Sequence, residues 1–222
     1  MFHNKDYFFL SILVFLVSFC SFCFAFDDGD YQYWNTESVS WKINDDWKMS
    51  LEEEFRFGDN GSNLYYQHSD LGLIYSGIAD WLDVGINYRH IFEEKNSKCK
   101  QENRPHLNAD VKWKLFDFNF SNRGRLEYRN REDAENFWRY RNKFTIKPPV
   151  KFTNLEIQLY IADEIFYDFD DETLNRNRFY SGFNFTIFKN LKADIFYLWE
   201  STEKGKNWND LHILGTKLKI CF

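Results

Sequence analysis

Apolar and polar residues alternate with a period of two along most of the chain beyond residue 31. In residues 47–57, Trp, Met, Leu and Phe occupy most of one parity, and Lys, Ser, Glu and Arg occupy the other. Because successive side chains of a strand point to opposite faces, this pattern predicts strands with one apolar face. The clearest predicted strands are residues 47–57, 106–116, 118–129, 137–147 and 191–200, and less regular ones are 32–43, 64–76, 82–92, 155–168, 177–188 and 211–222.

The connections between these eleven segments are expected to alternate in length. Short connections are expected near residues 44–46, 77–80, 117, 148–153 and 189–190. Longer, polar connections are expected near residues 58–63, 93–105, 131–136, 169–176 and 202–210. This alternation is typical of an antiparallel up-and-down barrel, and bacterial barrels normally have an even number of strands. We therefore predict an all-β barrel of ten to twelve strands.

The apolar face of these strands has two candidate environments. In a soluble sandwich or a lipocalin-like barrel it would point inward, whereas in an outer-membrane barrel it would contact lipid and the charged residues would fill the lumen. Strands of about 10–12 residues and aromatic residues near the strand ends favour the membrane barrel. Glu53 and Asp163 fall on the expected lipid face. A carboxylate is unfavourable there, so we expect a β-bulge to shift the parity.

Composition agrees with a barrel of this kind and narrows its partners. Aromatic residues make up 21% of the chain and charged residues 28%, a mixture that half-aromatic, half-charged strands accommodate. The net charge of −6 argues against a nucleic-acid partner. The expected contacts are outer-membrane lipid, the outer-membrane assembly machinery and small solutes.

The first 25 residues have the pattern of a secretory signal peptide. Lys5 precedes an apolar run over residues 7–17, and Cys23-Phe24-Ala25 has the small-x-small form of a cleavage site. An uncleaved membrane anchor is the alternative, because the apolar run is close to spanning length. We expect a cleaved signal peptide at residues 1–25, a barrel at residues 26–222, and a location in the outer membrane of a Gram-negative bacterium.

The last predicted strand continues its alternation to Phe222, with Leu214, Thr216, Leu218 and Ile220 on the same parity. A strand that ends on an aromatic residue resembles the C-terminal signal that the assembly machinery reads in bacterial outer-membrane barrels. We therefore expect Leu218, Ile220 and Phe222 to act as an assembly signal.

Charged residues on the predicted inner face form the candidate site. The residues singled out are Glu52, Glu54, Arg123, Arg125, Glu127, Arg139, Arg141 and Glu164. A natural hairpin register places Glu127 opposite Arg139. Pairing Lys147 with Glu156 across the next hairpin would carry Arg139 to Glu164. The predicted result is a row of two carboxylates bridged by Arg139, a geometry that suits a guanidinium group.

No enzyme activity, cofactor or metal site is expected. Asp210 and His212 share one face near a predicted rim, which resembles half of an omptin protease site, but no second carboxylate pair accompanies them. Cys99 and Cys221 are expected at opposite ends of the barrel, too far apart for a disulfide.

A series of short motifs runs through the mature chain in a recognisable order. The motifs are Trp34, Leu51-Glu52-Glu53-Glu54-Phe55-Arg56, Tyr88-Arg89, Asn122-Arg123-Gly124-Arg125-Leu126-Glu127-Tyr128, Arg139-Tyr140-Arg141, Asp163-Glu164-Ile165-Phe166 and Asn175-Arg176-Asn177-Arg178. Their order resembles the uncharacterised bacterial outer-membrane family called domain of unknown function 2490. The resemblance implies an outer-membrane barrel and implies no activity.

The expected function is a small passive pore with a charged, porin-like lumen. A plugged structural or interaction barrel without transport is the alternative, because few strands and long charged side chains favour a narrow interior. An outer-membrane hydrolase is less favoured.

Overall fold

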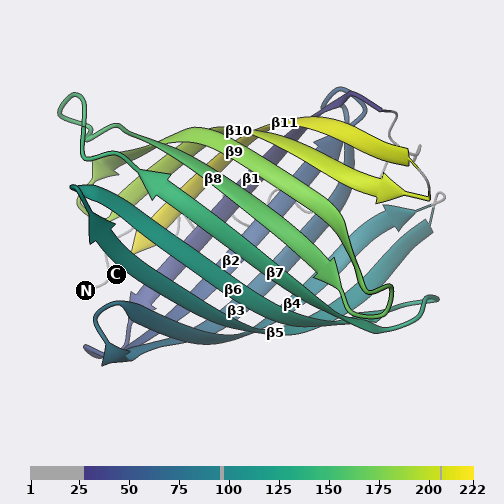
Figure 1. Ribbon diagram of the computed structural model, residues 1–222, viewed down its shortest axis with the longest axis horizontal. Helices are drawn as coiled ribbons and strands as arrows, with labels where there is room; N and C mark the ends of the chain where they lie inside the picture. Colours follow the sequence, from purple (N-terminus) through teal and green to yellow (C-terminus); the bar gives the residue numbers. More distant parts are fainter. Residues whose placement is uncertain (1–27, 96–97, 206) are drawn as a thin grey trace, which may run out of the picture.

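Eleven β-strands make up most of the computed structural model, which describes residues 28–95, 98–205 and 207–222 (Figure 1). The strands are β1 (Asp30–Lys42), β2 (Trp47–Gly58), β3 (Asn63–Ala79), β4 (Leu82–Lys95), β5 (Lys98–Leu115), β6 (Phe118–Arg131), β7 (Phe137–Lys147), β8 (Gln158–Asp168), β9 (Thr173–Phe188), β10 (Leu191–Lys204) and β11 (Asn207–Cys221). The predicted signal peptide at residues 1–25 lies outside the described residues. No helix in the described ranges is long and apolar enough to cross a membrane.

The strands form one closed barrel in chain order, which confirms the predicted fold class and strand count. Each strand pairs antiparallel with its chain neighbours, but β1 and β11 pair in parallel, from Asp30 opposite Leu211 to Ser40 opposite Cys221. With an odd number of strands, the first and last run in the same direction, so closure requires one parallel pair. The antiparallel expectation is therefore wrong at this one pair.

The described chain begins at one end of the barrel. We call the end where β11 finishes rim A, and the end where β1 begins rim B. The start of β1 is tied to rim B, because the Gly29 N–H donates to the Asp210 carbonyl and the Asp210 N–H donates to Asp28 Oδ1, both at 2.7 Å. The described chain therefore enters the barrel at rim B.

The predicted alternation of short and long loops is wrong. Residues 93–105 were expected to be a loop, but β4 continues to Lys95 and β5 begins at Lys98. The polar residues there extend the hairpin instead, with Lys95 Nζ 2.8 Å from Glu93 Oε2. The longest connection, residues 148–157 between β7 and β8, lies at rim A and holds an isolated bridge between Phe152 and Ile157.

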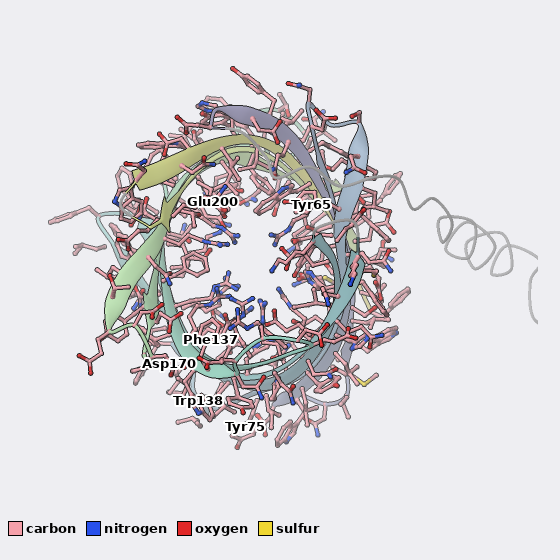
Figure 2. The ribbon with its side chains drawn as sticks, turned by 90° about the vertical axis from the view of Figure 1, so that its right-hand side faces the viewer. Tyr65, Tyr75, Phe137, Trp138, Asp170 and Glu200 are labelled. Atoms are coloured by element: carbon pink, nitrogen blue, oxygen red, sulfur yellow. The ribbon has the colours of Figure 1, made fainter. Side chains whose placement is uncertain are left out.

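The inner and outer faces of the strands follow the predicted parity. Large apolar side chains such as Leu71, Ile86 and Leu107 are exposed on the outside, whereas Glu127 and Glu164 are 0% and 1% exposed inside. Figure 2, a view along the barrel, shows nitrogen-bearing side-chain ends pointing toward the central axis.

No register shift falls at Glu53 or Asp163, so the expected bulges are absent at these two described positions. Glu53 lies directly opposite Glu37 and Ser69 on the outer face. Asp163 is exposed and accepts a hydrogen bond from Asn177 Nδ2 at 3.0 Å. The outer face thus carries a carboxylate on β2 and another on β8. Each has a hydrogen-bond donor on a neighbouring strand, Ser69 for Glu53 and Asn177 for Asp163.

One wall of the interior is apolar, which the alternation did not predict. The cluster consists of Trp34, Tyr160, Ala162, Tyr180, Leu198 and Ile213, with Phe196 and Leu211 packed against it. These side chains come from β1, β8, β9, β10 and β11, which adjoin in the barrel. The interior therefore combines a packed apolar wall with charged walls.

Candidate functional site

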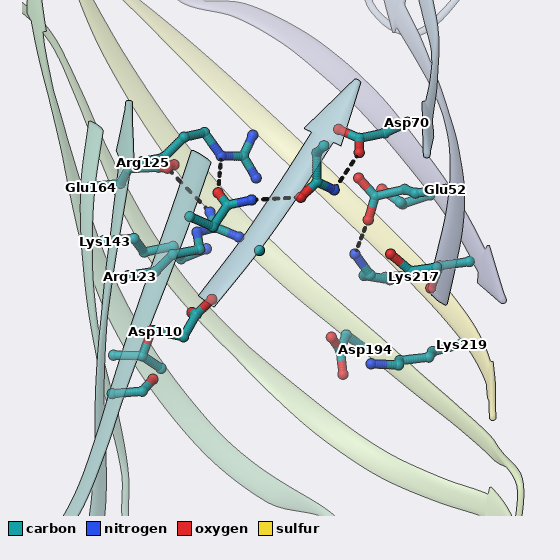
Figure 3. Close-up of a pocket in the computed structure, with 18 of the residues that line it drawn as sticks. Glu52, Asp70, Asp110, Arg123, Arg125, Lys143, Glu164, Asp194, Lys217 and Lys219 are labelled. Carbon is teal, nitrogen blue, oxygen red and sulfur yellow. Dashed lines mark hydrogen bonds and ion pairs between the residues drawn. The ribbon is translucent and has the colours of Figure 1, made fainter. Parts of the chain in front are cut away.

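The barrel interior contains a cavity of about 680 Å³ to which all eleven strands contribute lining residues. Figure 3 shows Arg123, Arg125 and Lys143 on one wall and Lys217 and Lys219 on another. Among the described lining residues, twelve are Lys or Arg and seven are Asp or Glu. The cavity wall thus carries an excess of positive charge, although the whole chain has a net charge of −6.

A chain of alternating charges begins at Glu127 on β6 and Arg139 on β7. These residues lie directly opposite each other, which is the register expected for this hairpin, and Arg139 donates to Glu127. Arg141 then bridges two carboxylates, with Nη1 3.6 Å from Glu127 Oε2 and Nη2 2.8 Å from Glu164 Oε1. The bond to Glu164 is a charge-assisted hydrogen bond, one of the strongest kinds in proteins, whereas the contact with Glu127 is an ion pair without a hydrogen bond.

Glu164 continues the chain of charges toward β9 and β10. The Tyr180 hydroxyl donates to Glu164 Oε2 at 2.9 Å, and Arg178 Nη1 lies 3.9 Å from the same oxygen. Arg178 Nε in turn donates to Glu200 Oε2 at 2.5 Å. We call the six residues Glu127, Arg139, Arg141, Glu164, Arg178 and Glu200 the charge chain; all are almost fully buried.

The predicted bridge from Arg139 to Glu164 is wrong. Arg139 lies opposite Asp168, and Glu164 lies opposite Lys143. Glu156 sits in the β7–β8 connection, where it pairs with Lys151 at 3.2 Å rather than with Lys147. The ten-residue span 148–157 sets this register, so the bridging guanidinium belongs to Arg141.

Glu52 and Glu54 lie on the wall formed by β1–β4, away from the charge chain. Glu52 accepts from Lys217 Nζ at 2.5 Å, and Arg89 Nη2 lies 3.5 Å away. Glu54 accepts from Arg56 Nε at 2.7 Å and from the Thr36 hydroxyl at 3.2 Å. The structure therefore gathers the eight predicted lumen residues into two separate clusters.

A relay of side-chain amides connects these two walls (Figure 3). Arg125 Nε donates to Asn108 Oδ1 at 2.8 Å, and Asn108 Nδ2 donates to Asn87 Oδ1 at 2.8 Å. Asn87 Nδ2 then donates to Asp70 Oδ1 at 2.7 Å. Asp70 also accepts from Arg89 Nε at 2.7 Å. The relay fixes the position of Arg125 without giving it a carboxylate partner.

Several interior residues were not among the eight predicted lumen residues. They are Trp34, His68, Asp70, Arg89, Arg178, Tyr180 and Glu200, all buried in the lumen. Trp34, Arg89 and Arg178 belong to the motif series, and for the others the signal was their parity within each strand. A parity identifies an inward position, but it does not say which inward side chains meet across the barrel.

The other residues considered from the sequence lie on the outside or at the rims. Leu218 and Phe222 are exposed, and the Phe222 N–H donates to the Ser40 carbonyl at 2.9 Å. His212 is on the outer face, with Nδ1 2.6 Å from the Tyr197 hydroxyl. Cys99 pairs across the sheet with Glu94 near rim B, whereas Cys221 is at rim A, so the two thiols are at opposite ends of the barrel. In the described ranges, no group of three or more His, Cys, Asp or Glu side chains is arranged to hold a metal ion.

Comparison with known proteins yields a family match. No curated protein matches the chain. A family model described as "Protein of unknown function (DUF2490)" matches residues 31–211, which extends from the start of β1 into β11. The match includes β2 to β10 in full, nearly all of β1 and the first part of β11, and it agrees with the resemblance seen in the motifs. The chain therefore belongs to the DUF2490 family.

Proposed function

We propose that this protein is a bacterial outer-membrane barrel that acts as a narrow passive pore for small solutes. The main support is the cavity of about 680 Å³, which is enclosed by a closed barrel and lined by charged side chains. A polar, charged interior of this kind is what a polar solute requires to cross a lipid bilayer.

The outer surface supports the membrane location. Exposed apolar side chains surround the barrel, for example Leu71, Ile86, Leu107, Ile165 and Leu214. Soluble monomers rarely expose continuous apolar surface of this extent. In lipid the same surface is favourable, and exposed Trp47, Trp81, Trp138, Trp199 and Trp208 suit the membrane interface.

Single-channel recording in planar bilayers tests the pore. We expect stable, ohmic conductance steps from purified, folded protein, because the proposed pore would provide a polar path through the barrel. Circular dichroism of the same sample should show β-structure, which controls for misfolding. Silent bilayers with correctly folded protein would contradict the pore.

A closed barrel is the second candidate, and fully buried side chains inside the barrel support it. Ile91, Phe166, Leu198 and Ile213 are nearly or fully buried inside the barrel, together with Glu127. If these side chains keep the interior closed in the membrane, the protein would act as a structural or interaction barrel. The same recordings separate the two candidates.

Thiol labelling tests the orientation, which we propose has rim B outside the cell. The β4–β5 hairpin projects there, because Lys95 pairs with Lys98 whereas the pairing of β5 with β6 begins only at Glu102. Long hairpins are typical of the extracellular side. A membrane-impermeant maleimide on intact cells should label Cys99 and leave Cys221 unlabelled. Cys99→Ser and Cys221→Ser variants identify the labelled site, and labelling of Cys221 alone would reverse the orientation.

A further inference from the structure

Four cations form a compact block on the facing positions of β6 and β7. Arg125 lies directly opposite Arg141, and Arg123 lies directly opposite Lys143. Like charges in directly opposed positions of a sheet are destabilising. We call these four residues the cation block; all four line the cavity.

Protein carboxylates neutralise only half of the cation block. Arg141 Nη2 is 2.8 Å from Glu164 Oε1, and Arg123 Nη2 is 3.4 Å from the same oxygen. Across the described residues, neither Arg125 nor Lys143 has a carboxylate within 4.0 Å. Lys143 Nζ instead lies 3.3 Å from the centre of the Tyr180 ring. Two positive charges are therefore left without an ion-pair partner.

The position of Arg125 makes this imbalance informative. Its side chain is only 7% exposed, and it is the first member of the amide relay to Asn108. A buried guanidinium with no counter-ion is unfavourable, and it persists where the site serves another purpose. Within the described part of the chain, the Arg125 guanidinium hydrogen-bonds through Nε, to Asn108, and not through Nη1 or Nη2. The fork of Arg125 is thus available to a ligand in the cavity.

We propose that the cation block is a binding site for a small divalent oxyanion of the phosphate type. Two uncompensated cations match a dianion in charge, and the planar fork of Arg125 suits two oxygens of a tetrahedral anion. Rings of Arg and Lys are a known basis of anion and phosphate selectivity in pores. This inference rests on the proposed pore and names its solute class.

Phosphate binding to the folded protein in detergent micelles tests the site without requiring conductance. We expect isothermal titration with sodium phosphate, at constant ionic strength in chloride, to show saturable binding to the wild type. The double variant Arg125→Gln/Lys143→Gln should weaken this binding at least tenfold. Lys219→Gln is the matched control, because it removes a cation from the same cavity outside the block, and it should change the affinity less than threefold.

Several outcomes would overturn the site. The site would be rejected if the wild type did not distinguish phosphate from chloride. It would also be rejected if Lys219→Gln weakened phosphate binding as much as the double variant does, because only the general positive charge of the cavity would then matter. If the double variant does not fold, Arg125→Gln alone serves in its place, and the wild-type titration remains decisive. In bilayers, phosphate should reduce the chloride conductance of the wild type. Phosphate binding by a protein that is silent in bilayers would reject the pore and retain the site.

Discussion

Replacing Arg141 with alanine is expected to lower the free energy of unfolding by about 3 kcal/mol. Arg141 is the residue that bridges Glu127 and Glu164, and both carboxylates are buried away from water. Removing the bridging cation leaves a deficit of positive charge between them, which typically costs about 3–5 kcal/mol in a buried pair. We expect the lower end of this range, because Arg139 and Arg178 still contact the two carboxylates.

Arg125→Ala is the matched control for this prediction. Arg125 and Arg141 are each 7% exposed and lie directly opposite each other, but only Arg141 contacts carboxylates. Removing Arg125 relieves repulsion, so the barrel should be unchanged or slightly more stable. Urea unfolding in lipid or detergent measures the midpoint of each variant. A shift of the midpoint reports a change in stability when the slope of the transition stays constant. Equal losses in the two variants would show that lost packing, rather than charge pairing, determines the effect.

Arg141→Lys separates charge from geometry at the same position. A lysine keeps the positive charge but presents a point charge on a flexible stem, so it is expected to reach one carboxylate rather than two. The free energy of unfolding of Arg141→Lys should therefore lie between that of the wild type and that of Arg141→Ala. A loss as large as that of alanine would show that the two-pronged contact carries the whole effect.

The sequence predicted which side chains face inward because that property is local. An alternating pattern fixes the face of each residue once a single member of the strand is placed. The alternation accordingly predicts an inward position for Arg123, Arg125, Arg139 and Arg141, and all four face the lumen. The simple hairpin between β6 and β7 also allowed the register of Glu127 opposite Arg139 to be predicted.

Contacts across longer connections were not predictable in the same way. The partner of Glu164 depends on the span 148–157, whose internal Phe152–Ile157 bridge has no clear sequence signal. The prediction of a loop at residues 93–105 was wrong for a related reason. Polar residues are typical both of loops and of strands that project beyond an apolar belt, and in this hairpin Glu93 and Lys95 compensate each other.

The apolar wall shows a further limit of the alternation argument. Leu198 and Ile213 lie on the inward parity that elsewhere carries charges, and both are fully buried. In a narrow barrel, inward side chains from non-adjacent strands also meet one another, so an inward position can be packed as well as hydrated. The sequence pattern therefore distinguishes the inner face from the outer face, but it does not distinguish a packed inward position from a hydrated one.

Phe196 on β10 packs between two glycines on the inner face of the barrel. It lies directly opposite Gly182 on β9 and Gly215 on β11. A Cβ atom at Gly182 would lie 2.6 Å from Phe196 Cβ and 2.7 Å from the Ile195 carbonyl oxygen. A Cβ atom at Gly215 would instead meet only the far edge of the Phe196 ring among its three nearest contacts.

Gly182→Ala is therefore expected to destabilise the barrel by about 2–3 kcal/mol, and Gly215→Ala by about 1 kcal/mol. The difference arises because backbone atoms and Cβ cannot move away, whereas a ring can rotate. Urea unfolding of both variants, in the wild-type and in the Phe196→Ala background, measures this difference in stability. In the Phe196→Ala background the cost of Gly215→Ala should disappear, because the ring that it meets is gone. The cost of Gly182→Ala should persist, because the Ile195 carbonyl and the Phe196 Cα and Cβ atoms remain. If truncating the ring rescues both variants equally, the close approach of β9 to β10 does not explain the requirement for glycine at position 182.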